Sequence, residues 1–506
     1  MIIKNSKYIA LAFGALGFVA CNDDLLPTGT EIEEAEAIEV SAGSADFSNF
    51  VAIGNSLTAG FMDGALFAAG QQNSVPNQLA QQFAKAGGGD FTQPLMNDNI
   101  GGLLLGGNQI QEPRLFFDGS GPVRLDAMPT TDLATNNPSG TFNNLGIPGA
   151  KSFHLLGPNY GELAGVPMGT ANPYFARITN GAAGNSPLDL ALAQNPSFFL
   201  LWIGNNDVLG YATSGGDGSD PITPLDGMPG VGFTATYNTL VGALTAGGAQ
   251  GIVANIADVT SIPFFTTVPH NPVPLDEATA GAVNQAYAAY NGGLQQALAA
   301  LAGTGLLTQE EVDRRTISFT AGEGNAVVIE DETLTDLGAI NPAFAALPQI
   351  RQATAEDLLI LPASSFIGTL ADPNNPLSVN GVAIPLSDRW VLIPSEQEEI
   401  ATATAAFNDV IRAAADQAGL AFFDANATLR QLTVGGVGFG NFTLTGSLVT
   451  GGAFSLDGVH PGARGYGLTA QEMLRAIDAT YGSNFIAAGA VPDAGSLPTN
   501  FPPTLQ

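Results

Sequence analysis

The residues with the clearest chemical content are a serine near the start of the chain and an aspartate and a histidine close together near its end. Ser56 lies in segment 54–60, GNSLTAG, directly after a short apolar run. Asp457 precedes His460 by three residues in segment 457–461, DGVHP. At this spacing the carboxylate can accept a hydrogen bond from the imidazole and orient it, and the imidazole can then remove a proton from a serine hydroxyl. The pattern predicts a catalytic triad of Ser56, His460 and Asp457.

Two turn segments contain groups that can stabilise the negative charge which such a reaction develops on a carbonyl oxygen. They are residues 144–149, NLGIPG, and residues 204–207, GNND. We expect the backbone N–H of Gly146 and the side-chain amide of Asn206 to join the N–H of Ser56 as donors to this oxyanion. Glycine and asparagine are also common in ordinary turns, and a serine after a strand can simply cap a helix. Each segment alone is therefore a weak signal.

In their order along the chain, the four segments resemble the four sequence blocks of the GDSL/SGNH hydrolase family. That family is named after a serine, a glycine, an asparagine and a histidine. The resemblance places these four groups at Ser56, Gly146, Asn206 and His460. It covers roughly residues 47–485, and the long insertions are unmatched.

The resemblance implies an α/β protein with a three-layer α/β/α, flavodoxin-like fold, a mostly parallel sheet and long loop insertions. It also implies a serine esterase that cleaves carboxylic esters of small molecules, glycans or lipids through an acyl-enzyme on Ser56, with no metal ion and no cofactor. Asn55 stands where the family usually has an aspartate. Because that aspartate is not the acid of the triad, this difference concerns the local turn geometry more than the chemistry.

Two other interpretations remain open on the sequence alone. An α/β-hydrolase also orders its triad as Ser, Asp and His, but its serine lies in a Gly-x-Ser-x-Gly turn, whereas Thr58 occupies the second glycine position here. A catalytically silent surface lipoprotein that binds glycans or lipids is the second alternative. His154 and His270 lack a carboxylate at the spacing of Asp457 and are expected to be structural or surface residues.

Composition limits the classes of partner. Of the 506 residues, 45% are hydrophobic and 12% are charged, which is typical of a globular protein. The 46 acidic and 15 basic residues give a net charge of −31, which disfavours binding to nucleic acid or to anionic lipid surfaces. We interpret the acidic surface as a solubility feature. Asp217, Asp220 and Asp226 lack the regular spacing of a calcium loop, which favours a solvated acidic loop.

Apolar runs that alternate with helical segments predict a parallel sheet covered on both faces. The expected strands are residues 50–53, 198–203, 251–256 and 420–423. The expected helices are residues 76–86, 275–301, 395–418 and 461–481.

Two of these helices have predicted local features. We expect helix 275–301 to break or bend near Gly292 and Gly293. Ser395 is a possible cap of the next helix, with Gln397 or Glu398 near the position of the capping acid.

Three stretches do not fit this alternation, namely residues 88–140, 209–232 and 305–393. They are too long for ordinary connections, and we expect insertions that fold over the active edge of the sheet. The hydrolase domain is placed at 47–485, followed by a C-terminal tail at 486–506.

The start of the chain predicts a lipid anchor. Lys4 and Lys7 precede an apolar run at 8–19, and Cys21, the only cysteine, follows a small residue. This arrangement resembles a bacterial lipoprotein signal, with residues 1–21 as signal peptide and Cys21 lipidated. Residues 22–46 then form a flexible acidic tether, and the protein is held in the cell envelope, at the outer membrane. A plain secretory peptide or a short membrane anchor is the alternative.

We expect Cys21→Ser to release the protein from the membrane fraction, or to block its maturation, because the only thiol that can carry a lipid is removed. Fractionation of cells that express the parent and the variant measures this, and esterase activity of the variant should be unchanged. Membrane association that survives the substitution would contradict the lipid anchor.

Overall fold

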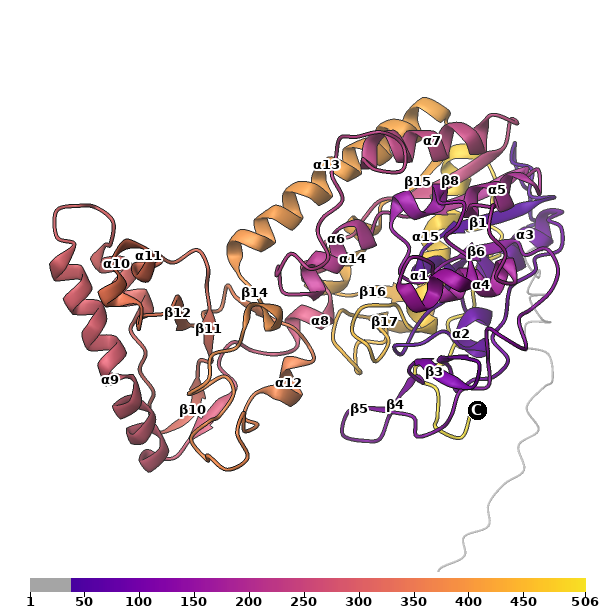
Figure 1. Ribbon diagram of the computed structural model, residues 1–506. Helices are drawn as coiled ribbons and strands as arrows, with labels where there is room; N and C mark the ends of the chain where they lie inside the picture. Colours follow the sequence, from indigo (N-terminus) through magenta and orange to yellow (C-terminus); the bar gives the residue numbers. More distant parts are fainter. Residues whose placement is uncertain (1–37) are drawn as a thin grey trace, which may run out of the picture. The chain divides into compact units, whose positions relative to one another are not determined.

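The computed structural model describes residues 38–506 (Figure 1). Cys21, the predicted signal peptide and most of the predicted tether lie outside the described residues. The architecture below is that of Val40–Gln506, which forms one compact unit.

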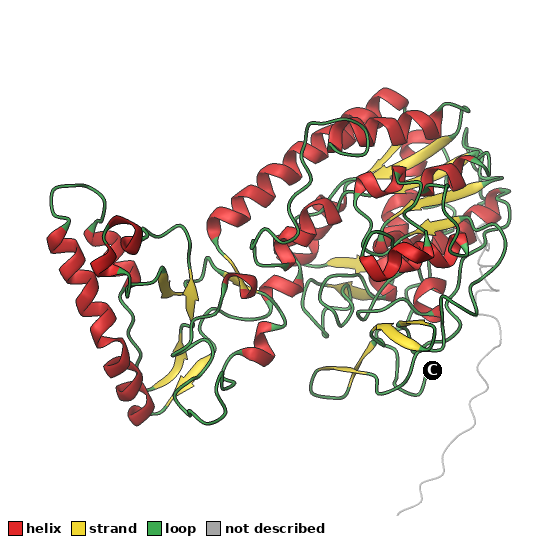
Figure 2. Ribbon diagram, viewed as in Figure 1, coloured by secondary structure: helices red, strands yellow, loops and turns green. Residues whose placement is uncertain are grey.

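A five-stranded parallel sheet is the centre of this unit (Figure 2). Numbered along the chain, its strands have the spatial order 2-1-3-4-5, which is a common order of doubly wound α/β sheets. The five strands in chain order are β1 (Phe50–Gly54), β6 (Asn144–Gly146), β7 (Phe198–Trp202), β8 (Gln250–Ala254) and β15 (Ala421–Phe423). The four predicted strands are thus confirmed. The short strand β6 was predicted only as a turn segment, because three residues with a central leucine carry little strand signal.

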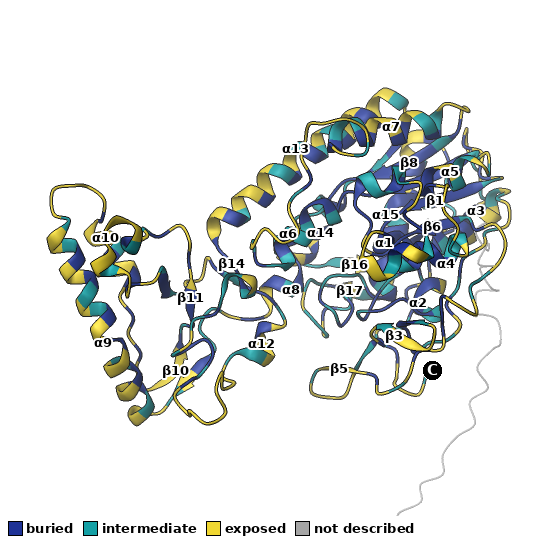
Figure 3. Cartoon of the chain, in the orientation of Figure 1, coloured by how far each residue is buried: buried dark blue, intermediate teal, exposed yellow. Residues whose placement is uncertain are grey.

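Helices cover both faces of the sheet, and alternate strand residues contribute to two separate hydrophobic clusters. On one face, α3 (Val75–Phe83) and α15 (Ala463–Tyr481) pack against residues such as Phe198. On the other, α5 (Pro187–Leu192), α7 (Phe233–Thr245) and α13 (Pro394–Ala418) pack against residues such as Phe199. Burial on both faces explains why the strands are apolar throughout (Figure 3).

The start of α13 differs from the prediction. The helix begins at Pro394, and the N–H of Ile393 donates a 2.7 Å hydrogen bond to Glu396 Oε2. Ser395 is therefore not the cap, and the acid of the first turn is Glu396 rather than Gln397 or Glu398. The helix starts one residue earlier than predicted, because proline is well tolerated at the first helical position, where an N–H would have no partner within the helix.

Helix α9 (Glu277–Ala300) is continuous, so the predicted break near Gly292 and Gly293 is wrong. A Cβ at Gly293 would lie 2.6 Å from a methyl carbon of Leu347. This glycine therefore permits close packing within the helix and does not interrupt it.

The three predicted insertions have different structures. Residues 88–140 form two antiparallel hairpins, β2 (Leu103–Leu105) with β3 (Asn108–Gln111) and β4 (Leu115–Phe117) with β5 (Pro122–Arg124). Residues 209–232 begin inside α6 (Asn206–Thr213) and continue as a loop.

The third insertion starts earlier than 305, because β9 (Val273–Leu275) pairs with β10 (Gly322–Asn325) and brings α9 with it. We call residues 273–393 the inserted segment. The other elements of the inserted segment are α10 (Gln309–Arg315), β11 (Val328–Glu330), α11 (Leu337–Ile340), β12 (Ile350–Gln352), β13 (Leu358–Leu359), α12 (Ala363–Phe366) and β14 (Val391–Leu392). Figure 1 shows α10 and α11, which lie within the predicted insertion 305–393, well apart from the five-stranded sheet together with α9, so the expectation that this stretch as a whole folds over the active edge is wrong.

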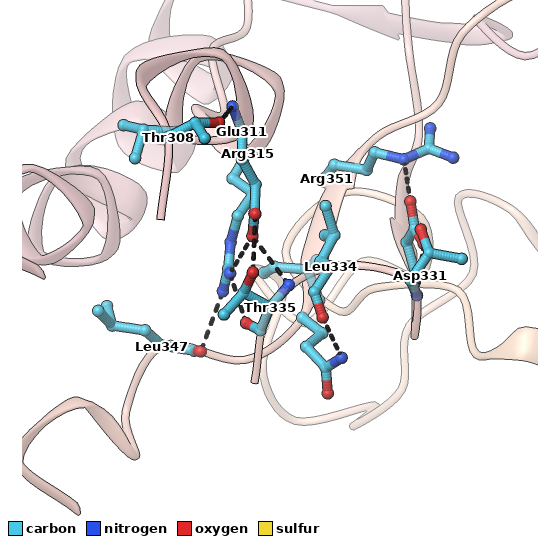
Figure 4. Close-up of polar contacts among 12 residues, drawn as sticks. Thr308, Glu311, Arg315, Asp331, Leu334, Thr335, Leu347 and Arg351 are labelled. Atoms are coloured by element: carbon cyan, nitrogen blue, oxygen red, sulfur yellow. Dashed lines mark hydrogen bonds and ion pairs between the residues drawn. The ribbon is translucent and has the colours of Figure 1, made fainter. Parts of the chain in front are cut away.

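Two buried arginines hold the inserted segment together (Figure 4). Arg315 pairs with Glu311 at 3.2 Å and donates to the carbonyl oxygens of Leu347 and Pro348. Arg351 pairs with Asp331 and with Asp357. Each guanidinium satisfies several buried acceptors, which a smaller side chain cannot do.

The end of the chain packs into the unit and is not a detached tail. Ala490, Ala494 and Phe501 belong to the hydrophobic cluster beneath α15, and Arg114 donates to the carbonyl oxygen of Phe501. Among the described residues, no helix has both the length and the hydrophobicity needed to cross a bilayer. The remaining helices and strands are α1 (Ser56–Ala59), α2 (Ala68–Gln72), α4 (Pro173–Thr179), α8 (Pro263–Thr266), α14 (Ala425–Val434), β16 (Val437–Phe439) and β17 (Phe442–Leu444).

Candidate active site

Ser56 is the first residue of the short helix α1, directly after β1. A Cβ at Gly54 would lie 2.3 Å from both Thr58 Oγ1 and the carbonyl oxygen of Trp202, so only glycine fits this tight strand-to-helix turn. Asn55 Oδ1 accepts a 3.0 Å hydrogen bond from the N–H of Leu57 and caps the helix. The turn therefore holds the Ser56 hydroxyl at one place at the end of the central strand.

The asparagine at position 55 fits this turn well. Its side chain is fully buried, and Nδ2 donates a 3.1 Å hydrogen bond to Asn205 Oδ1. An ionised aspartate has no proton to donate to that oxygen. The amide thus links the ends of β1 and β7 while it still caps α1, and the departure from the family pattern leaves the turn intact.

The structure brings all three predicted triad residues together. Ser56 Oγ lies 2.9 Å from His460 Nε2, and His460 Nδ1 lies 2.9 Å from Asp457 Oδ2. With the proton of the imidazole on Nδ1, Nε2 is free to accept the proton of the serine hydroxyl. The ring of Phe61 lies 4.7 Å from that of His460 and packs against it.

The carboxylate of Asp457 is held by backbone groups as well as by the imidazole. Oδ1 accepts from the N–H of Val459 and of His460, and Oδ2 accepts from the N–H of Gly64. Burial alone would raise the pKa of Asp457, but the charge of His460 and these hydrogen bonds outweigh it and lower the pKa to about 2. The acid of the triad is therefore ionised throughout the neutral range.

The Asp63–Gly64 turn that supports Asp457 was not found by sequence reasoning. Asp63 is buried, has a φ of 53°, and its Oδ1 accepts a 3.0 Å hydrogen bond from the N–H of Leu456. Its own N–H donates to Ser455 Oγ. The dipeptide Asp-Gly does signal a turn. Nothing in the sequence indicates that this turn meets a loop almost 400 residues later.

Asn206 and Gly146 have different surroundings from those expected. Asn206 is the first residue of α6, and its Nδ2 donates to the carbonyl oxygen of Ala150 at 2.9 Å. The N–H of Gly146 donates to Asn144 Oδ1 at 3.0 Å, and a Cβ there would lie 2.2 Å from the N atom of Ala59. Gly146 therefore permits close packing of α1 on β6, and its proton is already used within the strand.

Gly149, in the same segment, has an unused amide. Its φ is 81°, and its N–H has no hydrogen-bond partner in the part of the chain that the structure describes. Gly149 directly precedes Ala150, whose carbonyl oxygen binds Asn206. The N–H of Ser56 likewise has no partner within residues 38–506. The two glycines of segment 144–149 predict that the backbone can approach a ligand closely, but the sequence does not indicate which of them has a free N–H.

Asp207 ties the same segment to α6. It is buried, and its carboxylate accepts from the N–H and the hydroxyl of Ser152 at 2.8 and 2.7 Å. Burial raises the pKa of Asp207, and the hydrogen bonds from Ser152 oppose that change. The residue holds the turn at 149–152 against α6 and is not exposed to a ligand.

A cavity of about 110 Å³ opens beside Ser56 and His460. Asn205 and Asn206 contribute its polar wall. The rest is mainly apolar and includes Trp202, Leu209, Val259, Ile262, Phe423 and Leu429. A wider groove of about 930 Å³, rich in threonine, serine and glycine, adjoins it at Leu432. The site can therefore hold an apolar group beside the serine and a polar group farther out.

The other histidines lie outside this cavity. The His154 ring stacks on Tyr160 at 4.3 Å, and Nδ1 accepts from the N–H of Lys151. Burial and the nearby Lys151 charge lower the pKa of His154 to about 4.

No protein-family model, curated protein or solved structure matches this chain. The assignment of its chemistry therefore depends on the geometry of these residues.

We expect Asp63→Asn to change the pH dependence of stability. Burial is the main cause that raises the pKa of Asp63 to about 7, and the charge of Asp457 adds to it, while the Leu456 N–H and Arg114 lower it. When the pKa of an acid is higher in the folded state than in the unfolded state, the protein becomes less stable as pH rises from the unfolded-state pKa to the folded-state pKa. The parent should lose roughly 4 kcal/mol between about pH 4 and pH 7 from this group, and the variant should not.

Thermal unfolding of the parent and of Asp63→Asn over a pH series measures this difference. Asparagine tolerates the positive φ and keeps the acceptor for Leu456, so the variant should fold. The Tm of the variant should exceed that of the parent increasingly up to about pH 7, whereas exposed Asp226→Asn should show no such trend. A Tm difference that is independent of pH would contradict the assignment.

Proposed function

We propose that the protein is a serine esterase of the GDSL/SGNH type that hydrolyses carboxylic esters through an acyl-enzyme on Ser56. The proposal rests on two successive hydrogen-bond contacts of 2.9 Å, one between Ser56 Oγ and His460 Nε2 and the other between His460 Nδ1 and Asp457 Oδ2. The sheet order 2-1-3-4-5, with helices on both faces, supports the flavodoxin-like form of that fold.

In the proposed reaction, Ser56 Oγ attacks the ester carbonyl while His460 Nε2 removes its proton. The ionised Asp457 stabilises the imidazolium that forms and keeps its orientation. His460 then donates the proton to the leaving alcohol, and the acyl group remains on Ser56. Water repeats the cycle with His460 as base, which releases a carboxylic acid and the free serine.

The oxyanion that forms in both steps needs preorganised donors. We assign this role to the N–H of Ser56, the side-chain amide of Asn206 and the N–H of Gly149. Gly149 replaces Gly146 in this set because the amide of Gly146 is already bonded to Asn144. Asn206 Nδ2 has a second hydrogen available while the first remains bonded to Ala150.

The cavity supports an ester with an apolar acyl or alcohol group. Its lining beside Ser56 is mainly aliphatic and aromatic, so a charged group there would lose its hydration without gaining a partner. Attachment to a bacterial cell envelope through Cys21 is part of the same proposal and depends on the N-terminal sequence alone.

We expect Ser56→Ala, His460→Ala and the double variant to retain a similar small residue of esterase activity, because groups that act as one unit are not additive. Asp457→Asn should be impaired less, since the imidazole can still accept a proton part of the time. Rates on p-nitrophenyl esters from acetate to palmitate measure this. His270→Ala is the matched control, because that residue lies outside the cavity.

A fluorophosphonate should label the parent at Ser56 and should not label Ser56→Ala. A folded parent that neither reacts with the probe nor hydrolyses any ester of the series would contradict the proposal and favour a silent binding protein. Near-normal activity in His460→Ala would contradict the assignment of the base.

We expect Asn206→Ala to lower kcat by on the order of 10²- to 10³-fold with little change in KM, because the lost donor acts mainly in the transition state. Kinetics and Tm should be measured together. A merely structural asparagine would lower Tm and leave kcat of the folded fraction normal, which would remove Asn206 from the proposed oxyanion site.

A further inference from the structure

Three carboxylates from separate segments meet away from the active site. Glu332 follows β11, Asp388 begins a short 3-10 helix at Asp388–Trp390, and Glu396 lies in the first turn of α13. One carboxylate oxygen from each lies within 4.8 Å of the others. None of the three has an ion-pair partner among residues 38–506. We call these residues the carboxylate cluster.

The innermost member of the cluster is buried with an unused oxygen. Glu396 is 3% exposed, and only its Oε2 is bonded, to the N–H of Ile393. Glu396 Oε1 and Asp388 Oδ1 are both buried without a hydrogen-bond partner in the described residues. Unpaired buried carboxylate oxygens are rare because their lost hydration costs several kcal/mol. They therefore indicate either a proton shared between the two carboxyl groups or a missing positive ligand.

The nearby arginines are engaged elsewhere. Arg351 is held by Asp331, the neighbour of Glu332 in sequence (Figure 4). It is also held by Asp357. Arg389 stacks over the ring of Trp390 at 4.8 Å. The other charged groups that act on the cluster are mostly acids, namely Asp217, Glu330 and Glu399.

The turn after α6 covers the cluster closely. Gly215 and Gly216 have φ values of 70° and 77°. A Cβ at Gly216 would lie 2.0 Å from Glu396 Oε1, and a Cβ at Gly215 would lie 2.2 Å from the carbonyl oxygen of Asp388. Glycine at 216 lets the backbone approach the Glu396 carboxylate, and glycine at 215 lets it approach the backbone of Asp388. A fourth segment therefore covers the buried side of the cluster, whereas Glu332 is exposed and Asp388 is half-buried.

A shared proton is the competing explanation. Burial, together with the negative charge of neighbouring acids, raises the pKa of Glu396 to about 8 and that of Asp388 to about 6. One proton between Asp388 and Glu396 neutralises only one of the three charges, and the charge of Glu332, whose side chain is exposed, remains in contact with water. A divalent cation can bind all three carboxylates at once.

We propose that Glu332, Asp388 and Glu396 bind one calcium ion, which ties the inserted segment to the start of α13. The donor set is all oxygen and contains no histidine or cysteine, which selects a hard cation. Calcium accepts several carboxylates in irregular geometry, whereas magnesium keeps most of its water and uses one or two carboxylates. The site is separate from the proposed esterase triad and does not depend on that function.

The test uses the full chain, stripped of metal with EGTA at mildly alkaline pH so that the carboxylates are ionised. Calcium should bind with a stoichiometry of one and should raise Tm by roughly 2–5 °C at about a hundredfold excess over Kd. Magnesium, and sodium chloride at matched ionic strength, should raise it much less. Isothermal titration calorimetry measures the stoichiometry, and thermal unfolding measures the shift.

Glu396→Gln and Asp388→Asn should abolish the calcium-dependent rise in Tm. In the absence of calcium these variants should be at least as stable as the parent, because an uncompensated charge has been removed, and this comparison shows that they fold. The matched control is Glu323→Gln, an exposed acid of the inserted segment, and it should keep the full rise.

Two outcomes would overturn the proposal. One is a parent whose Tm does not respond to calcium. If its Tm also falls with rising pH in a way that Glu396→Gln does not share, the cluster holds a shared proton instead. The other is a calcium response that persists in both Glu396→Gln and Asp388→Asn, which would place the ion elsewhere.

Discussion

The carboxylate of Asp457 accepts hydrogen bonds from the backbone of Gly64, Val459 and His460 and from the His460 ring. These bonds join a loop near the end of the chain to a turn just after Ser56. They keep the acid ionised in a site that would otherwise favour its protonated form. The contact between Ser56 and His460 depends on these bonds, because a carboxylate that is fixed in place also fixes the orientation of the imidazole bound to it.

The central sheet supplies the other side of the site. In a doubly wound sheet, ligands bind where the strand order reverses, and here that point lies between β1 and β7. Ser56 follows the first of these strands and Asn206 the second, and Asn55 and Asn205 bond across the gap. The proposed nucleophile and oxyanion donor are thus neighbours because their strands are neighbours.

Buried acids recur in this strongly acidic chain, and each is compensated in a different way. Asp457 is stabilised as an anion by His460 and backbone amides, whereas Asp207 is bonded to Ser152. Asp63 has a backbone donor, but burial and, to a smaller extent, the charge of Asp457 raise its pKa, so its proton is retained to a higher pH. The carboxylate cluster has the fewest internal donors, which is why an external cation is the simplest compensation there.

The inserted segment shows that the catalytic loop is supported by distant parts of the chain. Leu361 of the inserted segment donates its N–H to the carbonyl oxygen of Phe264, and the N–H of Phe264 donates to the carbonyl oxygen of Gly458. This relay connects the inserted segment with the loop between Asp457 and His460. The insertion therefore reaches the site through residues near Leu359 and Leu361, while α9 lies elsewhere.

The sequence by itself determined the features that depend on neighbours along the chain. The spacing of Asp457 and His460 and the helices α3, α9, α13 and α15 follow from local pattern, because their hydrogen bonds close within a few residues. The strand before Ser56 follows from its apolar run. Only the tertiary structure decided that Gly149 rather than Gly146 has a free amide, that Asp63 and Gly64 support Asp457, that α9 is unbroken and that three acids converge. Each of these depends on contacts between segments far apart in sequence, where burial and close packing, rather than local propensity, set the free energy.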